Sequence, residues 1–591
     1  MSARSALRNA ADTGRLTDEP KSAAPDDIRL SAVVLGTIGL SLAFQLRRIF
    51  THQGNGDEFS FLARVYEYQR GTLTAPLQNF HVHLFGWLSR ISGSEIDQIV
   101  AGRLFMLVLE TGMLGLVYYA ARRFVARDAA LLGVLSYAVC NFVIAHGASF
   151  RTDPIATFLL MSAVALMLAP RLCRRQTLFA GVAVALAGLV TIKSVFYLPV
   201  IVAIAAWRLV EAADRRAMLL ILAVGGVASA GAFGLFYALH VASLAGAQPS
   251  DVVGAARGSA GKVIMADALF GSWRFLLIGA AGSPVTFAAI VAGIWICARG
   301  AINRSGVDRR RQRVLLAFAF PAATILFYRN SFPYYYAFAL APAAVLAAIA
   351  FDRIRRTPAR LIGVCGLSAA LVALQFAVRF QPGQDIQRNG LAVIHAMFPE
   401  PVSHIDPCYR VARYPEAGFF MSTWGMESYR AAGRPRLRNA IEREAPQFVI
   451  AGHTVLAAAF NPGAATIPAE YRLLEADERA LRENYIHHRG EIWIAGKTIE
   501  DIRAGEVRSV DVRIPGPYTV EAGGEISIDS RDHAPGDVVT LSKGPHLIAG
   551  GRDMPSVTLR WAHRQTQADA SPDLEPSFGR CLLTFNSVKG G

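Results

Sequence analysis

The chain has little charge and little cysteine for its length. Charged residues make up 18% of its 591 positions, whereas 53% are hydrophobic and the mean hydropathy is +0.33. This composition is too apolar for a soluble protein of this size and too polar for one that lies in a membrane throughout. We therefore expect several membrane spans and a separate soluble region.

Cysteine occurs six times, at positions 140, 173, 297, 365, 408 and 581. Four of these residues lie in or beside apolar stretches, which indicates core residues rather than a disulfide framework. Cys408 and Cys581 both fall in the expected soluble region, so a single disulfide between them stays open as an alternative.

Nucleic-acid-binding motifs, zinc-finger spacings and internal repeats are absent from the sequence. The net charge of +15 therefore indicates arginine-rich cytoplasmic loops, and we expect no nucleic-acid partner. No A-x-A-like cleavage site follows the first apolar run, so residues 1–28 are predicted to be a cytoplasmic tail and not a signal peptide.

About eleven apolar runs are long enough for transmembrane helices. They lie near 29–48, 99–120, 129–148, 154–170, 177–192, 194–210, 217–240, 273–297, 314–329, 333–351 and 360–379. Every second loop is rich in arginine, at 122–127, 171–175, 208–216, 304–313 and 353–360. The positive-inside rule places these loops in the cytoplasm. The loops 49–98, 241–272 and 328–336 then lie outside, and so does everything after residue 380.

The region after residue 380 contains no span. Residues 380–504 alternate strand-like runs with helical patterns, which predicts a small α/β module. Residues 505–591 carry short alternating runs between turn signals, as in a β-sandwich. The predicted fold is thus a polytopic, all-α membrane domain over 29–379, followed by a periplasmic α/β and β-sandwich region.

Three acids stand at the outer ends of predicted spans. Asp57 and Glu58 follow the first span closely, and Asp153 lies in the short break FRTDP between two later spans. Acids at a membrane edge are costly unless hydrated or paired, which favours a function. They could act as general bases, hold a metal or carry a proton. Solvated loop acids, with Asp153 as an N-cap before Pro154, are the alternative.

Cations, aromatic residues and histidines share this outer face. Lys193 could extend to the interface or bind a lipid phosphate as a point charge. The tyrosines at 334–336 fit an aromatic belt at the membrane interface. Arg329, together with Tyr334, could also bind a phosphate or a sugar. The histidines fit loop or substrate contacts better than a metal site, so no cofactor is expected and a divalent metal is not assumed. The further candidates for substrate binding are Arg151, Arg329, Tyr334, Tyr335, His81 and His83.

Six segments occur in one order along residues 30–350: GDEFSFLARVYEYQRG, NFHVHLFGWLSRISG, AGRLFMLVLE, FRTDPIATFLLM, TIKSVFYLPV and YRNSFPYYYAFALAP. Their order and topology resemble the GT-C class of integral-membrane glycosyltransferases, in particular bacterial relatives of protein O-mannosyltransferases and lipid A aminoarabinose transferases. The chain reads FHVH where many relatives have a Lys/His-Pro-Pro-like stretch, which leaves the contacts of His81 and His83 open.

The resemblance implies a role for each outer residue. Asp57 would be the catalytic base, with Glu58 beside it and Asp153 as the acid of the second outer loop. Lys193 would contact the donor phosphate, with Arg329 as a second cation. The donor would be a polyprenyl-phosphate sugar, and the acceptor a hydroxyl of an envelope glycan, lipid or protein. Transfer would invert the anomeric carbon at the periplasmic face of the bacterial cytoplasmic membrane.

A transporter or flippase of a lipid-linked or anionic substrate is the alternative function. Transporters often carry charges near the membrane midplane and show symmetry between their two halves. Here the acids gather at one face and no such symmetry is visible in the sequence. An enzyme requires Asp57, Asp153 and Lys193 to converge in the folded chain.

Overall fold

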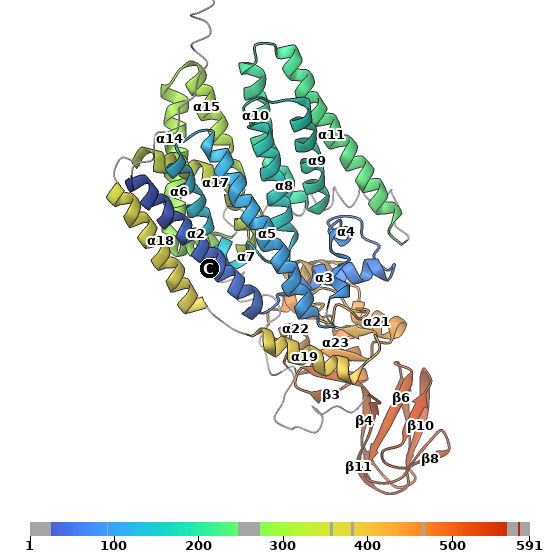
Figure 1. Ribbon diagram of the computed structural model, residues 1–591. Helices are drawn as coiled ribbons and strands as arrows, with labels where there is room; N and C mark the ends of the chain where they lie inside the picture. The colour runs from blue at the N-terminus through green and yellow to red at the C-terminus, as the bar shows by residue number, and fades with distance from the viewer. Residues whose placement is uncertain are drawn as a thin grey trace, which may run out of the picture.

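The computed structural model describes residues 25–91, 93–245, 272–354, 358–379, 383–461, 463, 467–563 and 577–579. Most of the predicted tail 1–28, most of the outer loop 241–272, and Cys581 therefore lie outside the described residues. Figure 1 shows a bundle of long helices with a smaller region of helices and strands at one end of it.

The bundle consists of helices close to the predicted spans. Their bounds are α2 Pro25–Thr51, α5 Glu95–Arg122, α6 Arg127–Ala138, α7 Asn141–His146, α8 Thr152–Met167, α9 Arg174–Val190, α10 Leu198–Glu211, α11 Arg215–Ala242, α13 Trp273–Gly282, α14 Pro284–Asn303, α15 Gly306–Ala317, α17 Pro333–Ile354 and α18 Pro358–Arg379. Within the described residues, six helical segments are long and apolar enough to cross a membrane by length and composition. The chain is a multi-pass membrane protein, whereas the count of about eleven spans stays a prediction.

Three predicted spans are broken into shorter helices. The run 129–148 divides at Val139 and Cys140, between α6 and α7. The run 273–297 divides at Ser283, between α13 and α14, because Pro284 has no backbone N–H and disfavours a helical conformation in the residue before it. The run 314–329 divides after α15 into the short helices α16 (Phe320–Ala323) and η3 (Thr324–Leu326). Pro321 lies in the first turn of α16, where a proline is tolerated.

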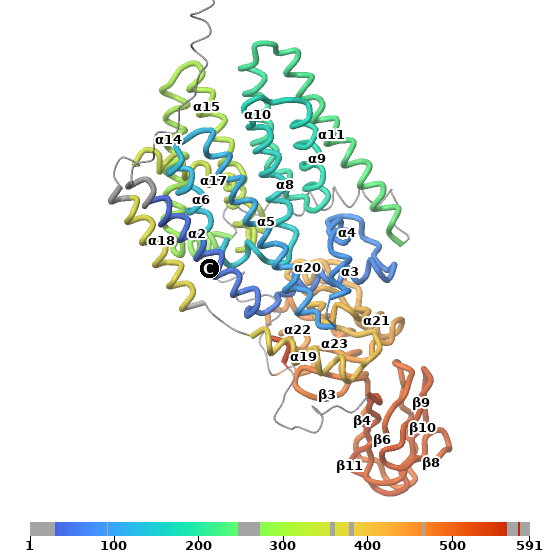
Figure 2. Tube along the Cα trace, viewed as in Figure 1, coloured from blue at the N-terminus to red at the C-terminus, as the bar shows by residue number. Residues whose placement is uncertain are grey.

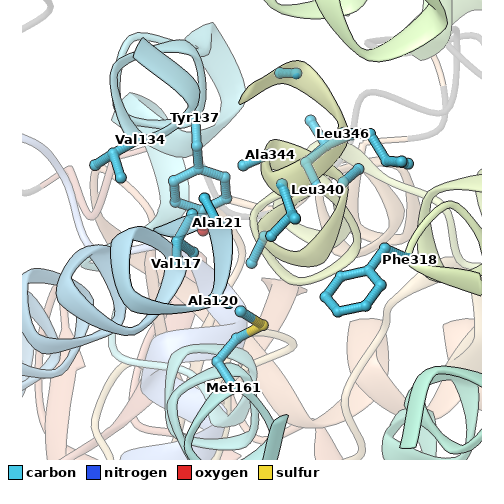
Figure 3. Packing of buried hydrophobic residues seen from close by; sticks show 14 of the residues in the cluster. Val117, Ala120, Ala121, Val134, Tyr137, Met161, Phe318, Leu340, Ala344 and Leu346 are labelled. Atoms are coloured by element: carbon cyan, nitrogen blue, oxygen red, sulfur yellow. The ribbon is translucent and has the colours of Figure 1, made fainter. Parts of the chain in front are cut away.

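The centre of the bundle is α17, most of which is buried. It packs against α5, α6, α8 and α14, and its alanines allow the helices to approach closely. Figure 3 shows the contact, with Val117, Ala120 and Ala121 of α5 and Tyr137 of α6 facing Leu340 and Ala344 of α17.

A proline inside α17 leaves a carbonyl for another helix. Pro342 cannot donate to the carbonyl of Phe338 four residues earlier. The Tyr197 hydroxyl donates to this carbonyl instead, at 2.7 Å. The buried backbone group is therefore satisfied, and the contact ties the start of α10 to the central helix.

Within the described residues, the region after α18 contains the short 3-10 helix η4 (Ala469–Tyr471) and five α-helices: α19 Gln384–Met397, α20 Thr423–Ala432, α21 Arg436–Glu444, α22 Thr454–Phe460 and α23 Glu475–Asn484. Its strands are β1 His404–Ile405, β2 Phe448–Ile450, β3 Tyr485–Arg489, β4 Ile492–Ile502, β5 Val507–Val512, β6 Gly516–Ala522, β7 Ile526–Ile528, β8 Arg531–His533, β9 Val538–Leu541, β10 Gly544–Gly550 and β11 Met554–Trp561. Cys408 is disulfide-bonded, whereas the four other cysteines in the described residues are free.

The strands form two sheets. One has the order β1-β2-β4-β11-β6-β9, with β3 also paired to β4, and the other has the order β5-β10-β7-β8. The 11-residue strand β4 pairs with β2 and β3 along its first half and with β11 along its second half. The first sheet therefore runs through both parts of the C-terminal region. Figure 2 traces the chain through this region, with β3 near α19 and α23, and β4 and β11 farther from the bundle.

Glycines allow α9 and α11 to touch. A Cβ on Gly181 of α9 would lie 2.2 Å from the carbonyl oxygen of Gly225 in α11, whereas a Cβ on Gly226 would meet nothing within 4 Å. We expect Gly181→Ala to cost about 1–3 kcal/mol through overpacking and to lower the apparent melting temperature in detergent. Gly226→Ala is the matched control and should leave it unchanged. Equal effects of both changes would contradict this packing.

Candidate active site

The first outer loop places two acids in the first turn of one helix. The helix α3 (Gly56–Gln69) begins after Asn55, whose side chain accepts a hydrogen bond from the Glu58 N–H at 3.1 Å. The Glu58 carboxylate accepts one from the Asn55 N–H at 3.0 Å in return. This capping box fixes the start of α3. Because successive helical residues point about 100° apart, Asp57 and Glu58 face different surroundings.

Glu58 is fully buried in an ion pair with Arg103 of α5. The guanidinium donates to both carboxylate oxygens, at 2.8 and 2.5 Å, and the Phe150 N–H donates to one of them at 2.9 Å. Burial alone would raise the pKa of Glu58, but the charge and hydrogen bonds of Arg103 lower it below its ordinary value. Both oxygens of Glu58 are therefore occupied.

The sequence did not single out Arg103, although an arginine inside an apolar run was a visible signal. Its guanidinium also donates to the carbonyls of His52 and Gln53, at 2.8 Å each. The residue before it, Gly102, has no Cβ, and one built there would lie 2.4 Å from the Phe150 ring. Phe150 can thus approach α5 and present its N–H to the buried carboxylate.

Asp57 starts a row of alternating charges. It forms an ion pair with Arg151, which lies 3.5 Å from Asp153, and Asp153 forms a second ion pair with Lys193. The four residues come from α3, from the start of α8 and from η2 (Ile192–Tyr197). The side chain of Asp57 is 23% exposed, whereas those of Asp153 and Lys193 are 4% and 10% exposed. The structure therefore brings Asp57, Asp153 and Lys193 together, with Asp57 nearest to solvent.

Tyr334 covers this row. The Arg151 Cζ lies 3.6 Å from the centre of the Tyr334 ring, and the Lys193 Nζ lies 5.4 Å from it. Both distances fit cation–π contacts. Tyr335 is buried behind Lys193, and its hydroxyl forms a 2.5 Å hydrogen bond with that of Thr324.

Arg329 has its own partners and does not join the row. It donates to Glu427 of α20 at 2.8 Å, and its Cζ lies 4.3 Å from the Trp424 ring. The neighbouring Asn330 accepts a hydrogen bond from the Trp424 indole at 2.6 Å. These contacts join the bundle to the C-terminal region.

The two predicted histidines lie within the loop 49–98, at the start of the short helix α4 (Val82–Phe85). His81 is buried, with its Nε2 3.2 Å from the carbonyl oxygen of Phe61, and burial lowers its pKa to about 4. It is therefore neutral at pH 7. His83 Nε2 lies 2.8 Å from His240 Nδ1 at the end of α11. Among the described residues, no group of three or more His, Cys, Asp or Glu side chains could hold a metal ion.

No protein-family model matches the chain, and no curated protein sequence matches it. The solved structures that are similar in fold include the following two. One is the oligosaccharyltransferase AglB from the archaeon Archaeoglobus fulgidus, with an inhibitory peptide and a dolichol-phosphate: 13% identity over 90% of this chain and 98% of that chain, with a TM-score of 0.52. The other is ArnT from Cupriavidus metallidurans, bound to undecaprenyl phosphate: 15% identity over 75% and 96%, with a TM-score of 0.51. The chain therefore has the fold of the GT-C glycosyltransferases, which confirms the fold class predicted from the sequence.

The Glu58–Arg103 pair can be tested through stability. Glu58→Gln leaves the buried guanidinium without its charge partner, and breaking such a pair costs about 3–5 kcal/mol. We expect a large fall in the apparent melting temperature in detergent. The matched control is Glu67→Gln, which removes the partly exposed pair with Arg64 on the same helix and should cost about 1 kcal/mol or less. Similar losses in both variants would argue against a central role for the buried pair.

Lowering the pH protonates Glu58 and so tests the same ion pair. Because the folded-state pKa of Glu58 lies below its ordinary value of 4.5, its contribution to stability is complete above about pH 4.5. It is lost as the pH falls through the folded-state pKa. The melting temperature of the wild type should therefore fall more steeply than that of Glu58→Gln as the pH is lowered from 5 to 3. Parallel curves would show that Glu58 does not titrate in this way.

Proposed function

We propose that the chain is an inverting glycosyltransferase that moves a sugar from a polyprenyl-phosphate donor to a hydroxyl acceptor, with Asp57 as the general base. The observation that carries the proposal is the row of charges Asp57–Arg151–Asp153–Lys193. An acid that reaches solvent stands beside two cations that are more deeply buried. A general base must reach the acceptor hydroxyl, and a leaving phosphate must be stabilised by nearby cations. The row supplies both.

The donor class is supported by the ligands of the two similar structures. AglB was solved with a dolichol-phosphate and ArnT with undecaprenyl phosphate, and both ligands are lipid phosphates. We transfer this donor chemistry to the present chain. The acceptor class is broader, and we propose a hydroxyl of an envelope glycan, lipid or protein.

In the proposed reaction the acceptor hydroxyl lies against Asp57. Asp57 takes its proton while the hydroxyl oxygen forms a bond to the anomeric carbon of the sugar. The bond from that carbon to the phosphate oxygen breaks, and its electron pair leaves with the polyprenyl phosphate. A single displacement of this kind inverts the anomeric carbon.

Arg151 links the base to the phosphate site. Lys193 and Arg151 would stabilise the negative charge that develops on the leaving phosphate. Without a bound phosphate, the positive charges of Lys193 and Arg151 are paired with the carboxylates of Asp57 and Asp153. A phosphate beside Lys193 would draw Arg151 away from Asp57 and free its carboxylate to accept a proton. Donor binding would thus prepare the base.

In this proposal Glu58 and Asp153 hold other residues in place and do not transfer a proton. Glu58 uses both oxygens on Arg103 and on backbone N–H groups, so we assign it to holding the loop rather than to proton transfer. Asp153 holds Lys193 and Arg151 in one place. Tyr334 covers Arg151 and would keep water from the cations.

The arginine-rich end of the bundle is proposed to face the cytoplasm. In Figure 1 the α10–α11 and α14–α15 connections lie at the end of the bundle opposite to α3 and the strands. With this orientation in the bacterial cytoplasmic membrane, the site and the C-terminal region face the periplasm. A lipid carrier would then be required, because nucleotide sugars are not present there.

The proposal is tested by comparative mass spectrometry of envelope glycans and lipids. A deletion strain is complemented with the wild-type chain, with Asp57→Asn, or with Asp385→Asn, which changes an exposed acid on α19. We expect one sugar mass on a defined acceptor to be restored by the wild type and by Asp385→Asn. Asp57→Asn should give about a hundredfold less or lower still, since general bases contribute about 10²–10⁴-fold. Full restoration by Asp57→Asn would refute the role of this acid.

The phosphate site is tested by binding of undecaprenyl phosphate to the purified chain. Lys193→Met removes a charge at nearly constant length and should raise the Kd about tenfold, or about 1.4 kcal/mol. Arg329→Met should change the Kd less than about twofold, because Arg329 is engaged by Glu427. The opposite order of effects would place the phosphate at Arg329, the second cation that the resemblance implied, and not at Lys193.

A further inference from the structure

The segment that precedes Asp57, residues 49–54, comprises the last three residues of α2 and the turn after them. This segment, the turn 49–54, is held from two sides. On the membrane side, Arg103 donates to the carbonyls of His52 and Gln53 at 2.8 Å. On the other side lies α19, the first helix of the C-terminal region. The turn is therefore fixed between a bundle helix and a helix more than 300 residues away in the sequence.

Gln387 of α19 makes the most complete of these contacts. Its Oε1 accepts a hydrogen bond from the Gly54 N–H at 2.7 Å, and its Nε2 donates to the Gly54 carbonyl at 2.9 Å. The Gln387 side chain is 1% exposed, and Gly54 is also buried. One side-chain amide thus satisfies both backbone groups of a buried glycine.

The neighbouring contacts of α19 follow the same face. Gln384 Nε2 donates to the Ile49 carbonyl at 3.2 Å, and the Gly383 N–H donates to the Thr51 carbonyl at 3.2 Å. A Cβ on Gly383 would lie 2.3 Å from the end of the Gln53 side chain, so a larger residue there would require that side chain to move. Gly383 at the N-cap of α19, together with Gln384 and Gln387 of the helix, therefore contacts the turn 49–54.

We infer that Gln387 is a positioning residue for the proposed reaction, acting through Gly54 on the place of Asp57. A glycine has wide conformational freedom, so its backbone depends on external partners to hold one conformation. Asp57 follows Gly54 by three residues and must meet both the acceptor hydroxyl and Arg151. The inference rests on the proposed role of Asp57. It also gives the C-terminal region a part in the site that does not depend on binding an acceptor.

The test compares Gln387→Met with Asn389→Met in the full-length chain. Gln387→Met keeps the length of the side chain and loses both hydrogen bonds, whereas Asn389 is exposed on the same helix. Each purified variant is added to detergent-solubilised membranes of the deletion strain, which supply their own donor and acceptor. The rate of product formation is followed by mass spectrometry at several dilutions of the membrane extract.

We expect Gln387→Met to lower kcat about tenfold, since small displacements of reacting groups are costly, with the apparent KM for the membrane extract changed less than about twofold. Hydrogen exchange in peptides that cover 49–58 should become faster. Asn389→Met should match the wild type in both measurements. A wild-type kcat for Gln387→Met, or a loss confined to KM, would overturn the inference.

Two further variants keep the result interpretable. Gln387→Asn keeps the amide but shortens the side chain, which weakens both hydrogen bonds to Gly54 without burying a charge, so its kcat should fall between those of Gln387→Met and the wild type. It also serves if Gln387→Met does not fold. Asp57→Asn in the same assay separates the two claims: activity in Asp57→Asn would refute the proposed function. An inactive Asp57→Asn together with a fully active Gln387→Met would refute only the positioning role.

Discussion

The buried ion pair between Glu58 and Arg103 is the contact on which the candidate site depends. An unpaired charge in such a place costs several kcal/mol, so the pair holds its neighbours to one arrangement. Glu58 also accepts a hydrogen bond from the Phe150 N–H. Asp57 is adjacent to Glu58 in the sequence, and Arg151 is adjacent to Phe150. Asp57 and Arg151 form a second ion pair beside the buried one. The buried pair therefore brings together the proposed base and the cation that it meets.

The site is assembled from distant parts of the chain. The charges come from α3, from the start of α8 and from η2, while Tyr334 closes over them from the start of α17. The C-terminal region contacts this end of the bundle at several places, among them Gln387 at the turn 49–54 and Glu427 at Arg329. Its first sheet continues without interruption from β1 to β9. The C-terminal region is thus joined to the site and is not a separate appendage.

Much of this could be predicted from local sequence. Apolar runs located the helices of the bundle, because a helix that is surrounded by lipid or by other helices is apolar on every side. Alternating runs located strands such as β6 and β11, because a strand that is buried on one face alternates apolar and polar residues. The breaks at Ser283 and after α15 were missed, although Pro284 and Pro321 mark them. Asp57 and Glu58 are equivalent in sequence and differ only in what the folded chain brings to them. Arg103 and Gln387 were not predicted, because their partners lie far away along the chain.

The central claim is that Lys193 and Arg151 receive a lipid phosphate and that Asp57 is then free to act as a base. A cryo-electron microscopy structure of the chain with undecaprenyl phosphate tests it most directly. We predict the phosphate in contact with Lys193 and Arg151, with the Asp57 carboxylate released from Arg151 and open to solvent. A phosphate bound at Arg329 or at the arginine-rich end of the bundle, with the Asp57–Arg151 pair intact, would contradict the account.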